Sequence, residues 1–124
     1  MDGITPRDRW EKVKASMNYD SLTVSPKISA IMRISMRGLL FILARYKFAS
    51  KMLQNRKKLT ILDLGCNDGL GDLMFKQDCD CERIIGCDFD ADAVKWAKEN
   101  LEDDILSFIE ADFMGKNFIG GGVD

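Results

Sequence analysis

The sequence predicts an α/β fold built on a parallel sheet, and three observations support this prediction. Short apolar runs typical of buried strands recur between residues 59 and 110. Segments with apolar residues at helical spacing separate these runs, and the connections are short. A glycine-rich turn at 65–71 follows the first run directly. Alternating strands and helices with short connections favour parallel strands joined by right-handed crossovers.

Length and composition indicate an ordinary globular protein. The chain has 124 residues, of which 46% are hydrophobic and 31% charged, so we expect one compact unit. A net charge of −2 argues against a dedicated nucleic-acid binder on bulk charge alone. No signal peptide is visible, and the apolar run at 39–44 is far too short to span a bilayer. We therefore expect a cytoplasmic protein without a membrane partner.

Residues 1–57 are expected to form an N-terminal helical cap on a sheet domain at 58–124. Thr5 followed by Pro6 is typical of a helix start, because threonine caps the free N–H groups and proline suits the first turn. We expect this first helix to end near Met17.

A second helical region begins at Ser25 and Pro26 by the same device and extends to about Leu53. Its apolar residues recur at helical spacing in two sets. Gly38 lies between the two sets, so we expect a kink or a break into two helices there.

The second helical region is strongly basic. Between Ser21 and Ile61 the sequence has nine basic residues and no acidic ones. These are Lys27, Arg33, Arg37, Arg45, Lys47, Lys51, Arg56, Lys57 and Lys58. Because residues 62–124 hold sixteen of the 20 carboxylates, a basic cap packed on an acidic domain is the simpler interpretation. The alternative is a non-catalytic regulatory module whose basic helices at 27–58 bind RNA or another anionic surface.

The first strand is expected at 59–64, buried on both faces because it is a nearly continuous apolar run. The later elements alternate between helix and strand. They are expected as a helix at about 69–76, a polar loop at 77–82, a strand at about 83–87, a helix at about 91–101 and a strand at about 105–110. Residues 118–124 are typical of a turn entering a further strand, which would be the fourth.

Four cysteines, Cys66, Cys79, Cys81 and Cys87, are expected to be reduced in the cytoplasm. The two at 79 and 81 have a Cys-x-Cys spacing, unlike the Cys-x-x-Cys of common zinc sites, and the chain has no histidine. We therefore expect no metal site. Cys66 and Cys87 lie at strand ends, where cysteine usually behaves as a small buried apolar residue.

Carboxylates stand at the carboxyl ends of all three predicted strands: Asp63, Asp88 and Asp112. These ends meet at one edge of a parallel sheet, where the ligand crevice of such folds lies. Gly65 and Gly69 would let bare backbone approach a ligand, and the next helix would point its free N–H groups at it. Each carboxylate could instead accept hydrogen bonds from turn N–H groups.

A dinucleotide-binding dehydrogenase is one candidate for this turn. Its G-x-G-x-x-G pattern, counted from Gly65, requires glycine at positions 67 and 70. The sequence has Asn67 and Leu70 there, so a pyrophosphate would meet side chains instead of bare backbone. This hypothesis therefore ranks below the others.

The segment 63–69, Asp-Leu-Gly-Cys-Asn-Asp-Gly, followed by Asp88 after the next strand, resembles the cofactor motifs of the class I S-adenosylmethionine-dependent methyltransferases. The resemblance covers about 40–124 and is strongest at 60–113. Asn67 stands where the commonest motif has glycine, and asparagine also tolerates positive φ. The implied fold is a Rossmann-like three-layer parallel sheet, incomplete with about three strands, preceded by the helical cap.

The resemblance implies S-adenosylmethionine as the cofactor and S-adenosylhomocysteine as its product. It implies that Gly65 and Gly69 line the methionine part and that Asp63 lies near its amino group. Arg45 could pair with the methionine carboxylate, or it could be a solvated arginine on the basic helix face.

At the nucleoside end, the resemblance implies that Asp88 binds the ribose hydroxyls and that Phe89 flanks the adenine. Asp112 would contact the adenine amine, with Phe113 stacking nearby. The expected cofactor-binding residues are Arg45, Asp63, Gly65, Cys66, Asn67, Gly69, Asp88, Phe89, Asp112 and Phe113.

The resemblance reaches the cofactor motifs and not the parts that differ with substrate, so the catalytic base and the methyl acceptor stay unassigned. We expect a fragment of a longer methyltransferase that is inactive alone. In this family a fourth strand pairs with the first, so the first strand would be an exposed apolar edge. A homodimer through that edge is the other expectation for partners, and nucleic acid is not excluded.

Overall fold

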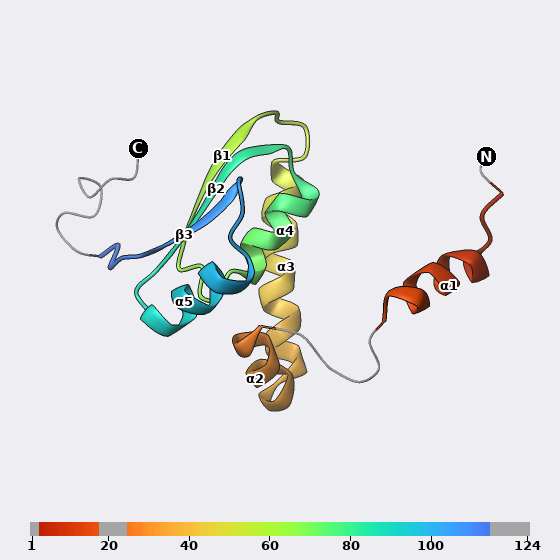
Figure 1. Cartoon of the computed structure of the whole chain (residues 1–124), viewed down its shortest axis with the longest axis horizontal. Coiled ribbons are helices and arrows are strands. Elements are labelled where there is room, and N and C mark those ends of the chain that lie inside the picture. Colours follow the sequence, from red (N-terminus) through yellow and green to blue (C-terminus); the bar gives the residue numbers. More distant parts are fainter. Residues whose placement is uncertain (1–2, 18–24, 115–124) are drawn as a thin grey trace.

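The computed structural model of the chain describes residues 3–17 and 25–114. The elements in these ranges are labelled in chain order in Figure 1. They are α1 (Pro6–Ser16), α2 (Pro26–Ile34), α3 (Met36–Met52), β1 (Leu59–Leu64), α4 (Leu70–Asp78), β2 (Cys81–Asp88), α5 (Ala91–Asn100) and β3 (Leu106–Glu110). The strand expected at 118–124 lies outside the described residues.

The three strands form one sheet in the order β1-β2-β3, and both pairs are parallel. Leu62 of β1 stands opposite Ile85 of β2, and Gly86 of β2 stands opposite Phe108 of β3. Each step along the sheet crosses over through one helix, first α4 and then α5. Successive right-handed crossovers in one direction place both helices on the same face. The α/β fold with a Rossmann-like parallel sheet is thus confirmed.

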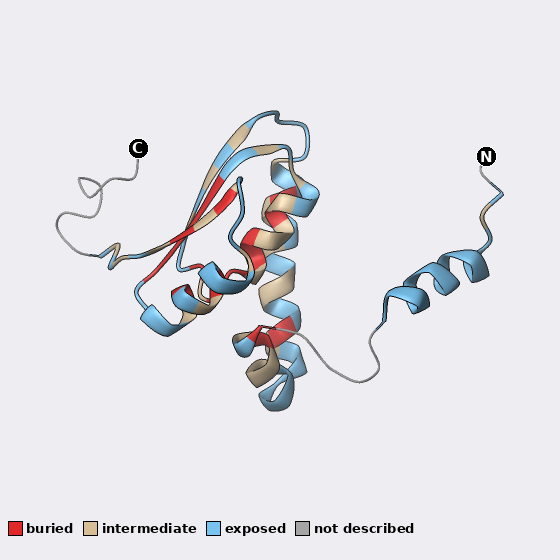
Figure 2. Cartoon of the chain, in the orientation of Figure 1, coloured by how far each residue is buried: buried red, intermediate tan, exposed pale blue. Residues whose placement is uncertain are grey.

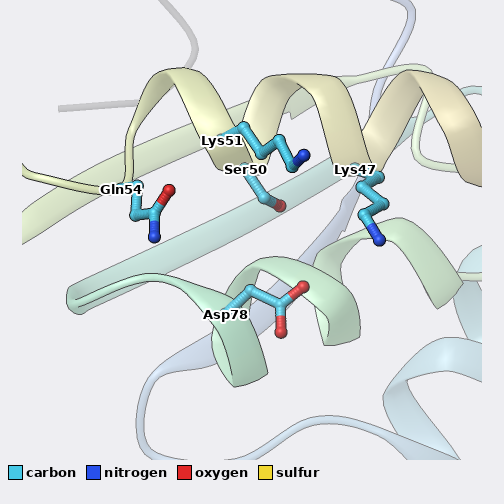
Figure 3. Close-up of a pocket in the computed structure, with 5 residues that line it drawn as sticks. All are labelled: Lys47, Ser50, Lys51, Gln54 and Asp78. Carbon is cyan, nitrogen blue, oxygen red and sulfur yellow. The ribbon is translucent and has the colours of Figure 1, made fainter.

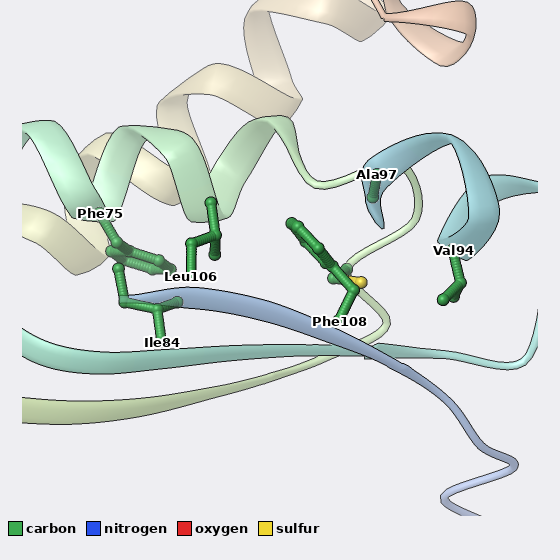
Figure 4. Close-up of a cluster of buried hydrophobic side chains, with 7 residues drawn as sticks. Phe75, Ile84, Val94, Ala97, Leu106 and Phe108 are labelled. Atoms are coloured by element: carbon green, nitrogen blue, oxygen red, sulfur yellow. The ribbon is translucent and has the colours of Figure 1, made fainter. Parts of the chain in front are cut away.

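The hydrophobic core lies between the sheet and helices α4 and α5, which Figure 4 shows together on one side of the strands. Ile84 and Leu106 from neighbouring strands are fully buried. Phe75 of α4 and Val94 and Ala97 of α5 belong to the same buried cluster and contribute to it from the helices. Burying each large apolar side chain contributes about 1.5–3 kcal/mol, so this face of the sheet accounts for much of the stability.

The opposite face of the sheet is more open at β1. Leu62 and Leu64 point away from the helices and are 40% and 47% exposed. The expected burial of β1 on both faces is therefore wrong for the part of the chain that is described. The reason is that β1 is an edge strand, and the packed helices α4 and α5 cover only the face that carries Ile61.

The break in the second helical region falls at Ser35, three residues before the glycine expected to mark it. Ser35 is extended and its side chain accepts the N–H of Gly38 at 3.1 Å. A serine at this position both ends α2 and caps α3, which leaves Gly38 inside the first turn of α3.

Helix α3 carries most of the contact between the N-terminal helices and the sheet domain. Tyr46 packs edge-on against Phe75 of α4, with the ring centroids 5.5 Å apart, and Ala49 and Leu53 join the core. Helix α1, by contrast, has no buried residue, as its uniform colour in Figure 2 shows. The division of the chain between residues 57 and 58 stays a prediction.

The connection between α4 and β2 is shorter than expected. α4 runs to Asp78 and β2 begins at Cys81, which leaves two residues where a polar loop at 77–82 was predicted. Cys79 in this connection and Cys81 at the start of β2 both pack against the core, so the connection is anchored instead of forming a solvated loop. The structure records no disulfide among the four cysteines.

Candidate functional site

The turn between β1 and α4 is tight and is tied to the end of β2. Gly65, Asn67 and Gly69 all have positive φ, at 83°, 53° and 90°. The N–H groups of Gly65 and Cys66 donate to the carbonyl of Cys87 at 2.7 and 3.0 Å. The turn therefore presents its backbone at the carboxyl edge of the sheet, where the sequence pattern predicts it.

The Asp88 carboxylate anchors this turn from the end of β2. It is buried, with 6% exposed, and its Oδ2 accepts the N–H of Asn67 at 2.8 Å. Its Oδ1 accepts the N–H of Asp90 at 2.9 Å. Each carboxylate oxygen has a second lone pair, so Asp88 can hold the turn and still accept from a ligand hydroxyl.

A second acid, Asp68, lies within the turn and ties it to the start of α2. Asp68 is 3% exposed, and its Oδ2 accepts the N–H of Lys27 at the start of α2, at 2.7 Å. No sequence motif indicates this role for Asp68. This contact joins residues 41 positions apart, so no local pattern indicates it.

Asp63 lies in a cluster of three polar side chains below the turn. The hydroxyl of Tyr46 on α3 donates to Asp63 Oδ2 at 2.8 Å. Asp72 on α4 is fully buried, and burial followed by the effect of Asp63 raises its pKa to about 9. Burial, and then the charge of Asp63, also raises the pKa of Tyr46 well above its usual value, so the phenol stays a donor.

Sequence reasoning missed the polar role of Tyr46 and missed Asp72 altogether. One signal was available for Asp72. It precedes Phe75 by one helical turn and therefore lies on the buried stripe of α4, where an aspartate is costly unless it has a partner.

Two hollows flank Gly65. The larger measures about 270 Å³, near the lower end of ligand pockets, and its lining includes Arg45, Tyr46, Asp63 and Gly65. The smaller one, of about 40 Å³, is lined by Arg45 and the turn itself, including Asn67. The structure thus brings Arg45, Asp63, Gly65 and Asn67 together around one position.

The residues expected at the nucleoside end lie beyond Asp88 along the same edge. Phe89 is 72% exposed, and Asp112 is exposed with its Oδ1 accepting the N–H of Met114 at 3.0 Å. Phe113 is half-buried. The N–H of Ala111 donates to the Asp88 carbonyl at 3.0 Å, which holds the segment after β3 against the end of β2.

Cys66 and Gly69 support the turn from within. Cys66 is 3% exposed, its thiol donates to the carbonyl of Asn67 at 3.4 Å, and burial raises the pKa of that thiol. Gly69 caps α4, and a Cβ there would lie 2.6 Å from the Phe108 ring, so only glycine fits.

A separate groove lies between α3 and α4, on the side of α3 that Figure 3 shows. Lys47, Ser50, Lys51 and Gln54 form one wall, and Asp78 at the end of α4 forms the other. Its volume is about 260 Å³.

Residues 3–17 and 25–114 contain no group of three or more side chains suited to hold a metal ion. None of the helices in these ranges is long and apolar enough to cross a membrane.

Comparison with known proteins identifies the class. Residues 62–124 match the model of a family described as a methyltransferase domain, so the chain belongs to that family. This confirms the resemblance to the class I S-adenosylmethionine-dependent methyltransferases. No curated protein matches the chain.

Two solved structures resemble part of the chain. One comes from the complex between the Haloferax volcanii Trm112 methyltransferase activator and a candidate methyltransferase. It is 27% identical, with a TM-score of 0.49, over 54% of this chain and 30% of that one. The other is a candidate S-adenosylmethionine-dependent methyltransferase from Listeria monocytogenes. It is 18% identical, with a TM-score of 0.44, over 56% of this chain and 32% of that one. The chain thus spans about a third of the length of each.

Proposed function

We propose that this chain is the cofactor-binding half of an S-adenosylmethionine-dependent methyltransferase. The observation that carries the proposal is the buried Asp88 carboxylate, which binds the N–H of Asn67 and retains free lone pairs beside the turn. A carboxylate placed at the end of the second strand, next to bare backbone, suits the two hydroxyls of a ribose. Membership of the methyltransferase-domain family supports the same assignment.

The larger hollow beside Gly65 suits the methionine end of this cofactor. An α-amino acid carries an ammonium and a carboxylate on one carbon. Asp63 and Arg45 line the same hollow and offer the complementary charges, with Gly65 between them as bare backbone. We propose that Asp63 receives the ammonium and Arg45 the carboxylate.

The nucleoside end would extend past Asp88. We propose that Asp88 accepts from the ribose, that Phe89 flanks the base, and that Asp112 and Phe113 hold its far edge. The exposed ring of Phe89 and the hydrogen bond from Ala111 to Asp88, which keeps the two strand ends together, support this arrangement. When bound, the cofactor supplies a methyl group activated by its sulfonium. The chain supplies position and complementary charge.

Calorimetric titration with S-adenosylhomocysteine tests the proposal. We expect heat of binding from the wild-type chain and about tenfold weaker binding in Arg45→Met, because a charge-assisted hydrogen bond is lost. Arg37→Met is the matched control, since Arg37 lies on the same helix but lines neither hollow beside Gly65, and its affinity should be unchanged. Absence of binding heat in the wild type would contradict the proposed function.

The second candidate function, RNA binding by the basic helices, is supported by exposed rings on α3. Phe41 and Phe48 are 66% and 68% exposed, close in sequence to Arg37, Lys47 and Lys51. Basic side chains beside aromatic rings suit a single-stranded nucleic acid. Two titrations distinguish the candidate functions: one with a short RNA at low and at raised salt, and one with S-adenosylhomocysteine. Salt-sensitive RNA binding without cofactor binding would favour this second function.

We further propose that the open edge of β1 pairs with another strand, either from the rest of a longer enzyme or from a second copy of this chain. Leu62 and Leu64 are exposed apolar residues on an edge strand, which is an arrangement that promotes pairing. We expect sedimentation velocity to show concentration-dependent association that Leu62→Lys reduces. Monomers at every concentration would exclude the homodimer.

A further inference from the structure

One buried acid, Asp72, has no hydrogen-bond donor among the described residues. Asp72 is fully buried in the first turn of α4, and no N–H or O–H group of the described residues donates to either carboxyl oxygen. One of these oxygens lies directly against Gly86 of β2, where any Cβ would displace it. An ionised carboxylate without a donor or a cation in such a place is very unfavourable.

The groups around Asp72 explain how it is accommodated. From β1, Asp63 acts on it, and after burial the influence of this second acid raises the pKa of Asp72 further. Tyr46 of α3 and the Cys66 thiol of the turn also lie within its electrostatic influence, and β2 contributes the uncharged backbone at Gly86. Two ionised carboxylates cannot donate to each other. A hydrogen bond between Asp63 and Asp72 therefore requires a proton on one of them, and the fully buried member is the one that loses most by ionising.

We propose that Asp72 carries a proton at neutral pH and donates it in a hydrogen bond to Asp63, which makes Asp72 a positioning residue for the cation-binding carboxylate. Asp63 then receives two donors from within the protein, the Tyr46 hydroxyl at 2.8 Å and the Asp72 acid. Together they fix the orientation of Asp63, and its remaining lone pairs serve the hollow beside Gly65. The pair carries one negative charge, which matches one ammonium group.

The protonation of Asp72 rests on the cluster alone, whereas the identity of the cation rests on the proposed function. The two can therefore fail separately. The pKa of Asp72, about 9 in the folded chain against an ordinary value of 3.8, also fixes the sign of the pH effect on stability. The stability that protonated Asp72 contributes is fully present below about pH 3.8 and is lost as the pH rises through about 9. The reason is that the unfolded chain releases this proton at a lower pH than the folded chain does.

The first experiment needs no ligand. Infrared difference spectra of the full chain at neutral pH, wild type against Asp72→Asn, should show the carbonyl band of a protonated carboxylic acid that is lost in the variant. Asp78→Asn, which alters the exposed acid at the end of the same helix, should leave the band in place. A missing band in the wild type, or a band that persists in Asp72→Asn, overturns the proposal.

The second experiment uses cofactor affinity to test whether Asp72 positions the Asp63 carboxylate. Asparagine keeps the shape of Asp72 and an N–H donor toward Asp63, so Asp72→Asn should bind S-adenosylhomocysteine about as well as the wild type at neutral pH. Because asparagine does not ionise, this variant should also lose less thermal stability than the wild type when the pH is raised to about 9. Asp72→Leu has no donor and should bind about tenfold more weakly. Equal affinity in all three proteins overturns the positioning role. The infrared band without any cofactor binding overturns only the proposed function and the identity of the cation.

Discussion

Replacing Asp88 with alanine is expected to abolish measurable binding of S-adenosylhomocysteine and to lower the free energy of unfolding by about 2–4 kcal/mol. The substitution leaves the N–H groups of Asn67 and Asp90 without their acceptor. The loss is costly because the Asp88 carboxylate that accepts from them is buried. The turn then loses its anchor to the end of β2, and a ribose loses its acceptor at the same time. Calorimetry measures the binding, and urea unfolding measures the stability.

The neighbouring acid provides the control for this prediction. Asp90 caps α5, and the recorded hydrogen bonds of its carboxylate go to the N–H groups of Asp92 and Ala93 on that helix. Asp90→Ala should cost about 1 kcal/mol as a lost helix cap and should leave the cofactor affinity nearly unchanged. If Asp88→Ala binds the cofactor as Asp90→Ala does, Asp88 is only a turn anchor and the proposed ribose contact is wrong.

Gly86→Ala is expected to destabilise the chain by about 2–3 kcal/mol, because the added methyl group has no space in the core. Its Cβ would lie 2.7 Å from the Phe108 ring and would also meet the buried Asp72 carboxyl. One of these two side chains must move, and both are enclosed by the helices above them. Urea unfolding of the variant measures the loss.

Gly38→Ala is the matched control for Gly86→Ala. A Cβ on Gly38 would meet its nearest neighbour, Ser35 Oγ, at an ordinary 3.6 Å. Alanine is also the better helix former, so this variant should be stabilised by about 0.5–1 kcal/mol. Equal stabilities for the two variants would mean that β2 can shift away from Phe108, and the close packing at Gly86 would then be unimportant.

Much of the fold could be predicted because its signals are local. The N-caps at Thr5, Ser25 and Asp90 are each followed by a helix, since capping depends on residues two or three positions away. Gly65 and Gly69 have the positive φ that a tight turn requires, and Asn67 tolerates it. The break between α2 and α3 falls at Ser35 and not at Gly38, because the serine side chain caps α3 whereas a helix can contain a glycine.

The site could be predicted only in part. The pattern of strand ends brings Asp63, Asp88 and Asp112 to one edge of the sheet, and the roles assigned to them toward a cofactor stay predictions. Spacing alone could not indicate that Asp88 binds the N–H of Asn67, 21 residues earlier, because that contact exists only after β1 and β2 pair. The exposure of Leu62 and Leu64 likewise depends on the position of β1 at the sheet edge.

The sequence by itself determined the alternation of elements, the turn at 65–69 and the family, because these follow from neighbouring residues and from a recognisable motif. Only the tertiary structure decided the chemistry below the turn. Asp72 reads as one more carboxylate along the chain. It becomes a proton-holding acid in our proposal because α4 packs against α3 and β2 and buries Asp72 away from water, with Asp63 as the neighbouring acid.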